Sequence, residues 1–274
     1  MKLPIPIIRD GKIYNEINII RPKSGVIADT RRLVDEGDNY IAIATFIAGC
    51  TESVISSDGT EIIDKSAIRN LIRHLPFRSA ELIAINIILL VDPDDGIEGI
   101  YTCPRCGNKV ISGVVENNGE VEIDTRDFIK NLPVNYMDGQ KNEIIIDFDE
   151  PIVVGNKNDP IDVVNSIGLN YPTLIQCSNA YKKFGGHDQL RLQFAIYVEA
   201  ITKVNGNDVD NRWKNMIGMP MFETMSNPDD VKKIGIAMNE YGIKPIVKKT
   251  CTKCGKVWEV NVSTSNFFVS GLQQ

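Results

Sequence analysis

Two copies of one short cysteine motif constrain this chain more than any other feature. Cys103 and Cys106 are separated by two residues and precede a glycine, and Cys251 and Cys254 repeat the pattern near the C-terminal end. In such a turn both thiolates point at one ion, and the glycine relieves crowding where the chain folds back. Two turns supply the four ligands of a tetrahedral structural site with no open position. We therefore predict one structural Zn²⁺, bound by Cys103, Cys106, Cys251 and Cys254, and no other cofactor.

The segment between the two turns is longer than half of the chain. Because loop-closure entropy rises only logarithmically with length, this separation does not prevent the turns from sharing one ion. Redox dithiols are an alternative, but a thioredoxin-like pair belongs at a helix N-terminus, whereas Trp258, Val260 and Val262 alternate like a strand. Four thiolates also suit an iron–sulfur cluster. Cys50 and Cys177 lie in apolar helical segments and are predicted to be core residues.

Composition indicates a folded protein that contains both helices and sheets. The chain has 274 residues, of which 43% are hydrophobic, and its six cysteines are too few and too clustered for a disulfide framework. A net charge of -6 argues against broad contact with nucleic acid or an anionic membrane. The longest apolar stretch, residues 82–91, is shorter than the ~20 residues of a bilayer span, and no signal-peptide core is present. We expect a soluble, unexported protein in a reducing compartment.

The first half of the sequence predicts a hairpin followed by helices. Asp10-Gly11 tolerates the positive φ of a type I′ turn and lies between two β-rich segments. Ser24 and Asp64 are predicted helix caps, and Gly37 a helix stop. The predicted elements are strands at 5–9 and 12–20, helices at 24–36 and 39–50, a helix after Asp64, and an apolar central helix that begins at Ser79.

The second half repeats this order in outline. The sequence predicts a strand pair at 143–148 and 152–154, helices at 172–184, 190–204, around Trp213 and at 227–241, and a strand on each side of both CxxCG turns. Since residue identity outside the turns is not convincing, duplication and convergence of the two turns both stay open.

The predicted fold class is α+β, with an N-terminal β-hairpin and helical cluster, a second α/β half, and a zinc ribbon that joins them. The predicted domains are an N-terminal hairpin and helical domain (1–98), a first ribbon arm (99–115), a second helical half (116–245), and a second ribbon arm with a tail (246–274).

Other catalytic chemistry is sparse in the sequence. His74 and His187 are the only histidines, and neither belongs to a metal-binding pattern. Acidic residues at 92–96, and the pair Asp147 and Asp149, lack the spacing of a calcium loop and are predicted to be solvated turns. No phosphate-binding glycine loop or nucleophile elbow is present. We predict no catalytic residues and a protein that is not an enzyme, with a hydrolase of unrecognised metal site as the enzymatic alternative.

Basic residues surround both CxxCG turns and allow two interpretations. They are Arg105, Lys109, Lys248, Lys249, Lys253 and Lys256. Cations near a thiolate-rich site offset its negative charge, which is the simpler interpretation. They also make a zinc-ribbon nucleic-acid-binding protein the alternative function.

The N-terminal part of the sequence contains the pattern LPIPIIRDGKIYNEINIIRPKSGVIADTRRL, followed by LIRHLPFRSAELIAI. This pattern resembles the baseplate hub and tail assembly proteins of long-tailed contractile phages of the T4 type and of related contractile injection particles. Those proteins open with a hairpin whose second strand ends in Arg-Pro, here Arg21-Pro22. They carry CxxC pairs, and the last is followed by strands and a Phe-Phe pair, here Phe267-Phe268. The resemblance covers residues 1–110 and 225–274.

The resemblance implies a structural or assembly component of a phage-like contractile tail baseplate. Its partners would be other tail or baseplate proteins in a symmetric assembly, without a membrane and without nucleic acid. It would be located in the virion tail or a phage-like particle that assembles in the host cytoplasm. The zinc ion would then clamp the two halves in one orientation, with a contribution on the order of 10 kcal/mol. The length of the chain favours a retained component over a transient chaperone.

Overall fold

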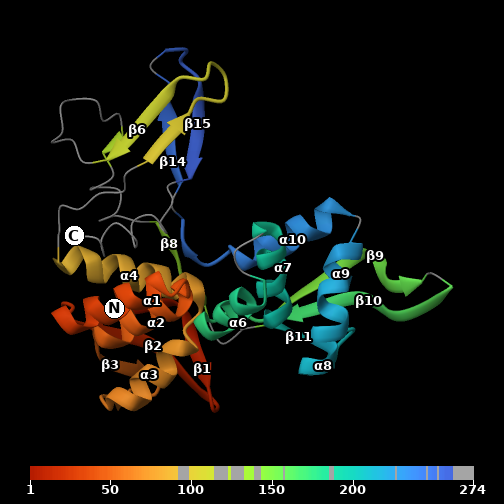
Figure 1. Ribbon diagram of the computed structural model, residues 1–274, viewed down its shortest axis with the longest axis horizontal. Coiled ribbons are helices and arrows are strands. Elements are labelled where there is room, and N and C mark those ends of the chain that lie inside the picture. Colours follow the sequence, from red (N-terminus) through yellow and green to blue (C-terminus); the bar gives the residue numbers. More distant parts are fainter. Residues whose placement is uncertain are drawn as a thin grey trace.

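The computed structural model describes residues 1–91, 99–113, 123–124, 133–138, 143–156, 158–184, 188–225, 227–244, 246–251 and 253–261. It is a mixed α/β protein with an N-terminal antiparallel hairpin and several helices, in agreement with the coarse prediction. Figure 1 shows a first half (residues 1–91, red to orange) beside a second half (residues 133–244, green to blue). In the described part of the chain, no helix has the length and apolar character needed to cross a membrane.

The first half packs helices against a four-stranded antiparallel sheet of order β1-β2-β3-β4. Its elements are β1 (Lys2–Arg9), β2 (Lys12–Ile19), α1 (Ser24–Asp35), α2 (Asn39–Gly49), β3 (Thr51–Ser56), β4 (Glu61–Ile62), α3 (Lys65–Arg73) and α4 (Phe77–Val91). Asp10 and Gly11 have φ of 50° and 73°, which confirms the predicted hairpin turn. Asp64 accepts a hydrogen bond from the Ala67 N–H and caps α3 as predicted. Most of α4 is buried, which confirms it as the central helix.

The second half contains another four-stranded antiparallel sheet, of order β9-β10-β11-β12. A short antiparallel pair of β8 and β13 lies against α4 and β1 of the first half. The elements are β8 (Val134–Asn135), β9 (Ile144–Asn156), β10 (Asp159–Leu169), α6 (Leu174–Phe184), α7 (Gln189–Ala200), β11 (Ile201–Val204), β12 (Asn207–Asp208), α8 (Asn211–Trp213), the π-helical turn η1 (Lys214–Gly218), α9 (Met219–Thr224), α10 (Pro228–Met238) and β13 (Gly242–Ile243).

Two irregularities of the first sheet recur in the second. Residues 3–6 of β1 bulge out opposite Asn15 of β2. In the second sheet, residues 148–151 of β9 bulge out opposite Asn165 of β10. A bulge is a specific local feature that bends its strand, so its recurrence at the same place in both sheets indicates a shared architecture.

The match extends from the second strand to the third. Glu52 of β3 and Thr202 of β11 are each skipped in the pairing with the neighbouring strand. These positions, 52 and 202, are 150 residues apart, and so are Asp38 and Asp188, whose carboxylates cap α2 and α7. A constant spacing through strands and helices requires no insertion or deletion between them. We infer that the two halves arose by duplication, since convergence of the CxxCG turns would not create matching bulges.

Each half has its own hydrophobic core, and a few residues cross between them. Among the described residues, Leu174 and Ile243 of the second half pack into the first core, and Ile5 packs into the second. On α6, the Ser178 hydroxyl donates to the Asp38 carboxylate across the boundary at 2.8 Å. Helix α6 therefore holds the second half against the first.

The predicted strand pair at 143–148 and 152–154 is wrong. Both segments belong to one strand, β9, whose antiparallel partner is β10. Asp149-Glu150-Pro151, which separates the two predicted strands, resembles a turn because proline cannot donate to a strand ladder. In the structure these residues occupy the bulge, where no ladder bond is needed.

The predicted helix at 190–204 is too long. Helix α7 ends at Ala200, and β11 then pairs with β10. Asn205 and Gly206 follow with φ of 49° and 79°, so the residues that were interpreted as a helix stop form a hairpin turn. Strands β3 and β4 of the first half were not predicted; β3 pairs with β2, which is distant in sequence, and β4 is a two-residue strand that pairs with β3.

Several predicted helix ends are also wrong. Ser24 is the first residue of α1 and makes no capping bond. Helix α4 begins at Phe77, and Ser79 lies buried inside it. Helix α10 ends at Met238, short of the predicted Tyr241. Predictions at residues 92–96, His187 and 267–268 fall outside the described residues.

The Ser79 hydroxyl is predicted to be important for stability, because it bonds the bulge of β1. It accepts from the Ile5 N–H at 2.9 Å and donates to the Ile5 carbonyl at 2.8 Å. In the Ser79→Ala variant two buried backbone groups lose their partner, so the free energy of unfolding in urea should fall by about 2 kcal/mol. Ser24→Ala, at an exposed site, should change it by less than about 0.5 kcal/mol. Equal effects of the two substitutions would contradict this interpretation.

Candidate metal centre

Two antiparallel hairpins, here called the cysteine hairpins, carry the CxxCG turns. The first consists of β5 (Gly99–Thr102) and β6 (Lys109–Gly113), and the second of β14 (Ile246–Thr250) and β15 (Val257–Asn261). This confirms a strand on each side of both turns. Figure 1 shows the cysteine hairpins together, apart from the helices of both halves.

The two turns have the same backbone geometry. The N–H of Cys103 donates to the carbonyl five residues later at 2.8 Å, and the N–H of Cys251 does the same at 2.9 Å. The glycine that follows each second cysteine donates its N–H back to the first cysteine of its turn. Gly107 and Gly255 have φ of 70° and 67°, a region that favours glycine, so each glycine is needed for its turn to close.

The four thiol groups converge on one point. The Sγ atoms of Cys103, Cys106, Cys251 and Cys254 all lie within 4.8 Å of one another. The Sγ distances from Cys103 to Cys254 and from Cys106 to Cys251 are both 3.7 Å. A tetrahedral ion with metal–sulfur bonds of about 2.3 Å requires sulfur–sulfur distances of about 3.8 Å. The donor set and its spacing therefore fit a single zinc ion.

The thiols of the first turn differ in acidity in this arrangement. Burial alone would raise the pKa of Cys103, but hydrogen bonds from the backbone N–H groups of Arg105 and Cys106 and from nearby thiols lower it to about 7. The backbone N–H of Asn108 lowers the pKa of Cys106, but burial and the neighbouring sulfur atoms outweigh it and raise the value to about 11. The Cys103 thiolate thus forms readily while Cys106 holds its proton, so binding a cation at the full set releases protons.

The site can hold a metal ion without offering it for chemistry. Four sulfur ligands complete a tetrahedral shell and leave no position for a bound water. Within the ranges that the structure describes, no further group of three or more histidine, cysteine or acidic side chains could hold a metal. All four predicted ligands come together. An iron–sulfur cluster would use the same four thiolates, so the identity of the metal stays a prediction.

The other predicted thiols and the described histidine lie elsewhere. Cys50 and Cys177 are buried, and burial raises the pKa of each thiol to about 12, in agreement with the predicted core role. His74 lies at the end of α3, and burial lowers its pKa. These groups do not join the cysteine cluster.

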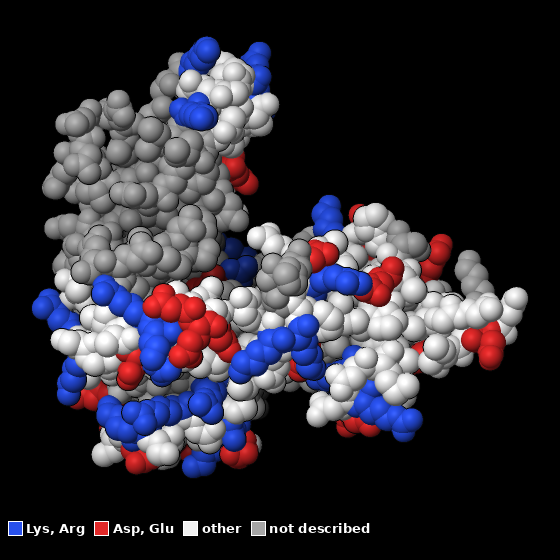
Figure 2. Space-filling model, viewed as in Figure 1, with Lys and Arg blue, Asp and Glu red and all other residues white. Residues whose placement is uncertain are grey.

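The cysteine hairpins carry exposed positive charge. Arg105, Lys109, Lys248, Lys253 and Lys256 are all exposed, and the side chain of Lys249 lies outside the description. Figure 2 shows Lys and Arg side chains over the hairpins at the top of the view. On the rest of that face, basic and acidic side chains are interspersed.

Comparisons with protein-family models, curated proteins and solved structures found no match.

Metal analysis of the purified protein by mass spectrometry should find one zinc per chain. The Cys106→Ser, Cys254→Ser double variant should lose the ion, because two of its four ligands lose their thiolates. Its melting temperature should also fall, since binding to the folded site contributes directly to stability. Cys50→Ala is the matched thiol control and should keep the zinc. Iron in place of zinc, or zinc retained by the double variant, would contradict the assignment.

Proposed function

We propose that this protein works by binding other proteins, as a structural or assembly component of a phage-like contractile tail baseplate. In this proposal one zinc ion fastens the ends of its two halves. The observation that carries it is the four-cysteine cluster, which joins two distant segments and has no open ligand position. The Arg21-Pro22 pattern of the N-terminal hairpin supplies the resemblance to baseplate proteins.

The position of the cluster suits a fastening role. The first cysteine hairpin follows α4 of the first half, and the second follows α10 and β13 of the second half. A metal bound by both hairpins fixes the C-terminal ends of both halves to one point. Structural zinc sites supply roughly 10–16 kcal/mol at neutral pH, which would exceed the stability of most single domains. The docking surfaces would therefore be rigid before assembly.

An exposed apolar surface supports protein binding. The outer parts of β9 and β10, here called the β9–β10 arm (residues 152–164), extend beyond the helices in Figure 1. Ile161 and Val163 of β10 are 69% and 36% exposed. Val153 pairs directly with Val163. Contiguous exposed apolar side chains mark interaction sites, and we assign this one to another protein of the tail.

Nucleic-acid binding at the cysteine hairpins is the second candidate. The exposed basic side chains near the metal site favour it. Such binding would weaken steeply with salt, because each phosphate contact releases counterions. If the protein does not bind DNA or RNA at low salt, this candidate is eliminated.

The Ile161→Lys, Val163→Lys variant should incorporate into tail particles at least about tenfold less than the unchanged protein, because charge on the arm prevents apolar burial. Quantitative mass spectrometry of purified particles and assembly intermediates measures this. Ile63→Lys is the matched control, since Ile63 is equally exposed, at 68%, but lies in the first half. Absence of the unchanged protein from both preparations would overturn the baseplate proposal.

A further inference from the structure

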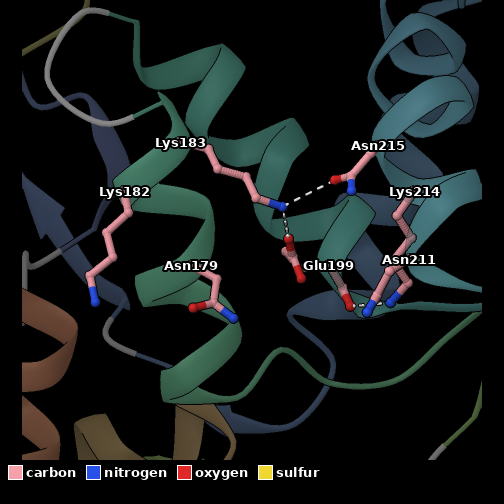
Figure 3. A pocket seen from close by; sticks show the side chains of 7 residues that line it. All are labelled: Asn179, Lys182, Lys183, Glu199, Asn211, Lys214 and Asn215. Carbon is pink, nitrogen blue, oxygen red and sulfur yellow. Dashed lines mark hydrogen bonds and ion pairs between the residues drawn. The ribbon is translucent and has the colours of Figure 1, made fainter.

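A polar cavity of about 330 Å³ lies in the second half, between α6, the C-terminal end of α7 and the α8–η1 segment (Figure 3). Its inner lining is formed by Asn179, Lys183, Glu199, Asn211, Lys214 and Asn215. Lys182 stands at the rim, and Figure 3 shows its side chain directed away from the others. The volume is at the lower end of the range for small-molecule sites.

Two ammonium groups approach the cavity from opposite sides. The Lys183 Nζ donates to a Glu199 carboxylate oxygen at 2.8 Å and to the Asn215 side-chain oxygen at 3.3 Å. From η1, the Lys214 Nζ donates to the backbone carbonyl of Glu199 at 2.7 Å. Lys214 is half-buried, and loss of hydration lowers its pKa, which means that its charge is poorly compensated where it lies.

The balance of charge in the cavity is positive. Its inner lining carries the two lysine ammoniums and one carboxylate, that of Glu199. Lys182 at the rim lies 3.4 Å from the Asp38 carboxylate and is partly neutralised by it. This positive site lies in a chain with a net charge of -6.

The first half has an apolar contact at the position that corresponds to this cavity. Gly49 corresponds to Glu199 at the spacing of 150 residues, and a Cβ atom on Gly49 would lie only 2.6 Å from the Val26 side chain. Helices α1 and α2 are therefore in close apolar contact there. In the second half, Gln176 occupies the position of Val26 and donates to the Glu199 carbonyl at 2.8 Å. A polar contact thus replaces an apolar one.

The lysines also replace apolar residues of the first half. Lys183 corresponds to Leu33. Lys214 follows the capping Asp210 by four residues, as the fully buried Ile68 follows Asp64. Burying a lysine where the sister half buries isoleucine costs stability, because the ammonium loses hydration. Since the fold does not require these lysines, a ligand is the better explanation for them.

We propose that this cavity binds the phosphate group of a small phosphorylated molecule. Lysine ammoniums are effective phosphate ligands, and Lys183 and Lys214 would contact the phosphate oxygens. The side-chain amides of Asn179 and Asn211 offer donors and acceptors for the rest of the molecule. Both Lys214 and Asn215 lie in the π-helical turn η1, a distortion that often accompanies functional sites.

Isothermal titration calorimetry on the full-length, zinc-loaded protein tests this site with two probes, inorganic phosphate and adenosine monophosphate. We expect a Kd below about 1 mM for at least one of them. Tighter binding of the nucleotide would identify a phosphate ester as the ligand, and equal or tighter binding of inorganic phosphate would identify the free ion.

The Lys214→Met variant should weaken binding by at least about tenfold, because methionine keeps the apolar stem and removes the charge. Asn179→Ala, at an exposed position of α6, should weaken the binding of adenosine monophosphate by about threefold. This variant keeps the test valid if Lys214→Met fails to fold. Lys232→Met, at an exposed site on α10, is the matched control and should leave the Kd unchanged. No heat with either probe, or an unchanged Kd in both cavity variants, would overturn the proposal.

Discussion

Four cysteine thiols within 4.8 Å of one another set the main constraint on this architecture. If all four were thiolates without a cation, their mutual repulsion would drive the hairpins apart, whereas one divalent ion holds four of them in a tetrahedral shell. The two cysteine hairpins follow different halves of the chain, so an ion bound by all four thiolates would tie two separately built cores together. The relative position of the halves would then depend on that ion as well as on the packing of α6.

The second half packs on the first through α6. Helix α1, which corresponds to α6 in the first half, does not offer the same apolar contact. On α6, Leu174 is buried in the first core and Tyr181 stacks edge-on against Tyr40 at 6.3 Å. The corresponding positions of α1 hold the polar Ser24 and Arg31. Terminal repeats of an array carry a polar outer face, and α1 fits this description because it does not repeat the apolar contact that α6 makes.

The sequence was sufficient to predict the four-cysteine cluster because its members lie in two local motifs with fixed geometry, Cys103-x-x-Cys106 and Cys251-x-x-Cys254. The N-terminal hairpin was also predictable, since Asp10-Gly11 encodes its turn locally. Strands β9 to β12 were not, because register depends on pairing with distant residues, and Pro151 imitates a turn. The duplication was obscured in the same way: its two copies match in bulges and spacing, while few side chains remain identical.

Comparison of the two halves separates structural residues from residues free to take on function. Where both halves keep the same feature, as with the caps Asp38 and Asp188, the fold requires it. At Gly49 the first half makes an apolar contact, whereas at the corresponding position the second half has Glu199 beside Lys183. The fold is therefore compatible with either kind of contact at this position. The second half also carries the longer strands of the β9–β10 arm. The first half thus keeps the close apolar packing, and the residues that we propose to bind a partner protein and a phosphate group lie in the second.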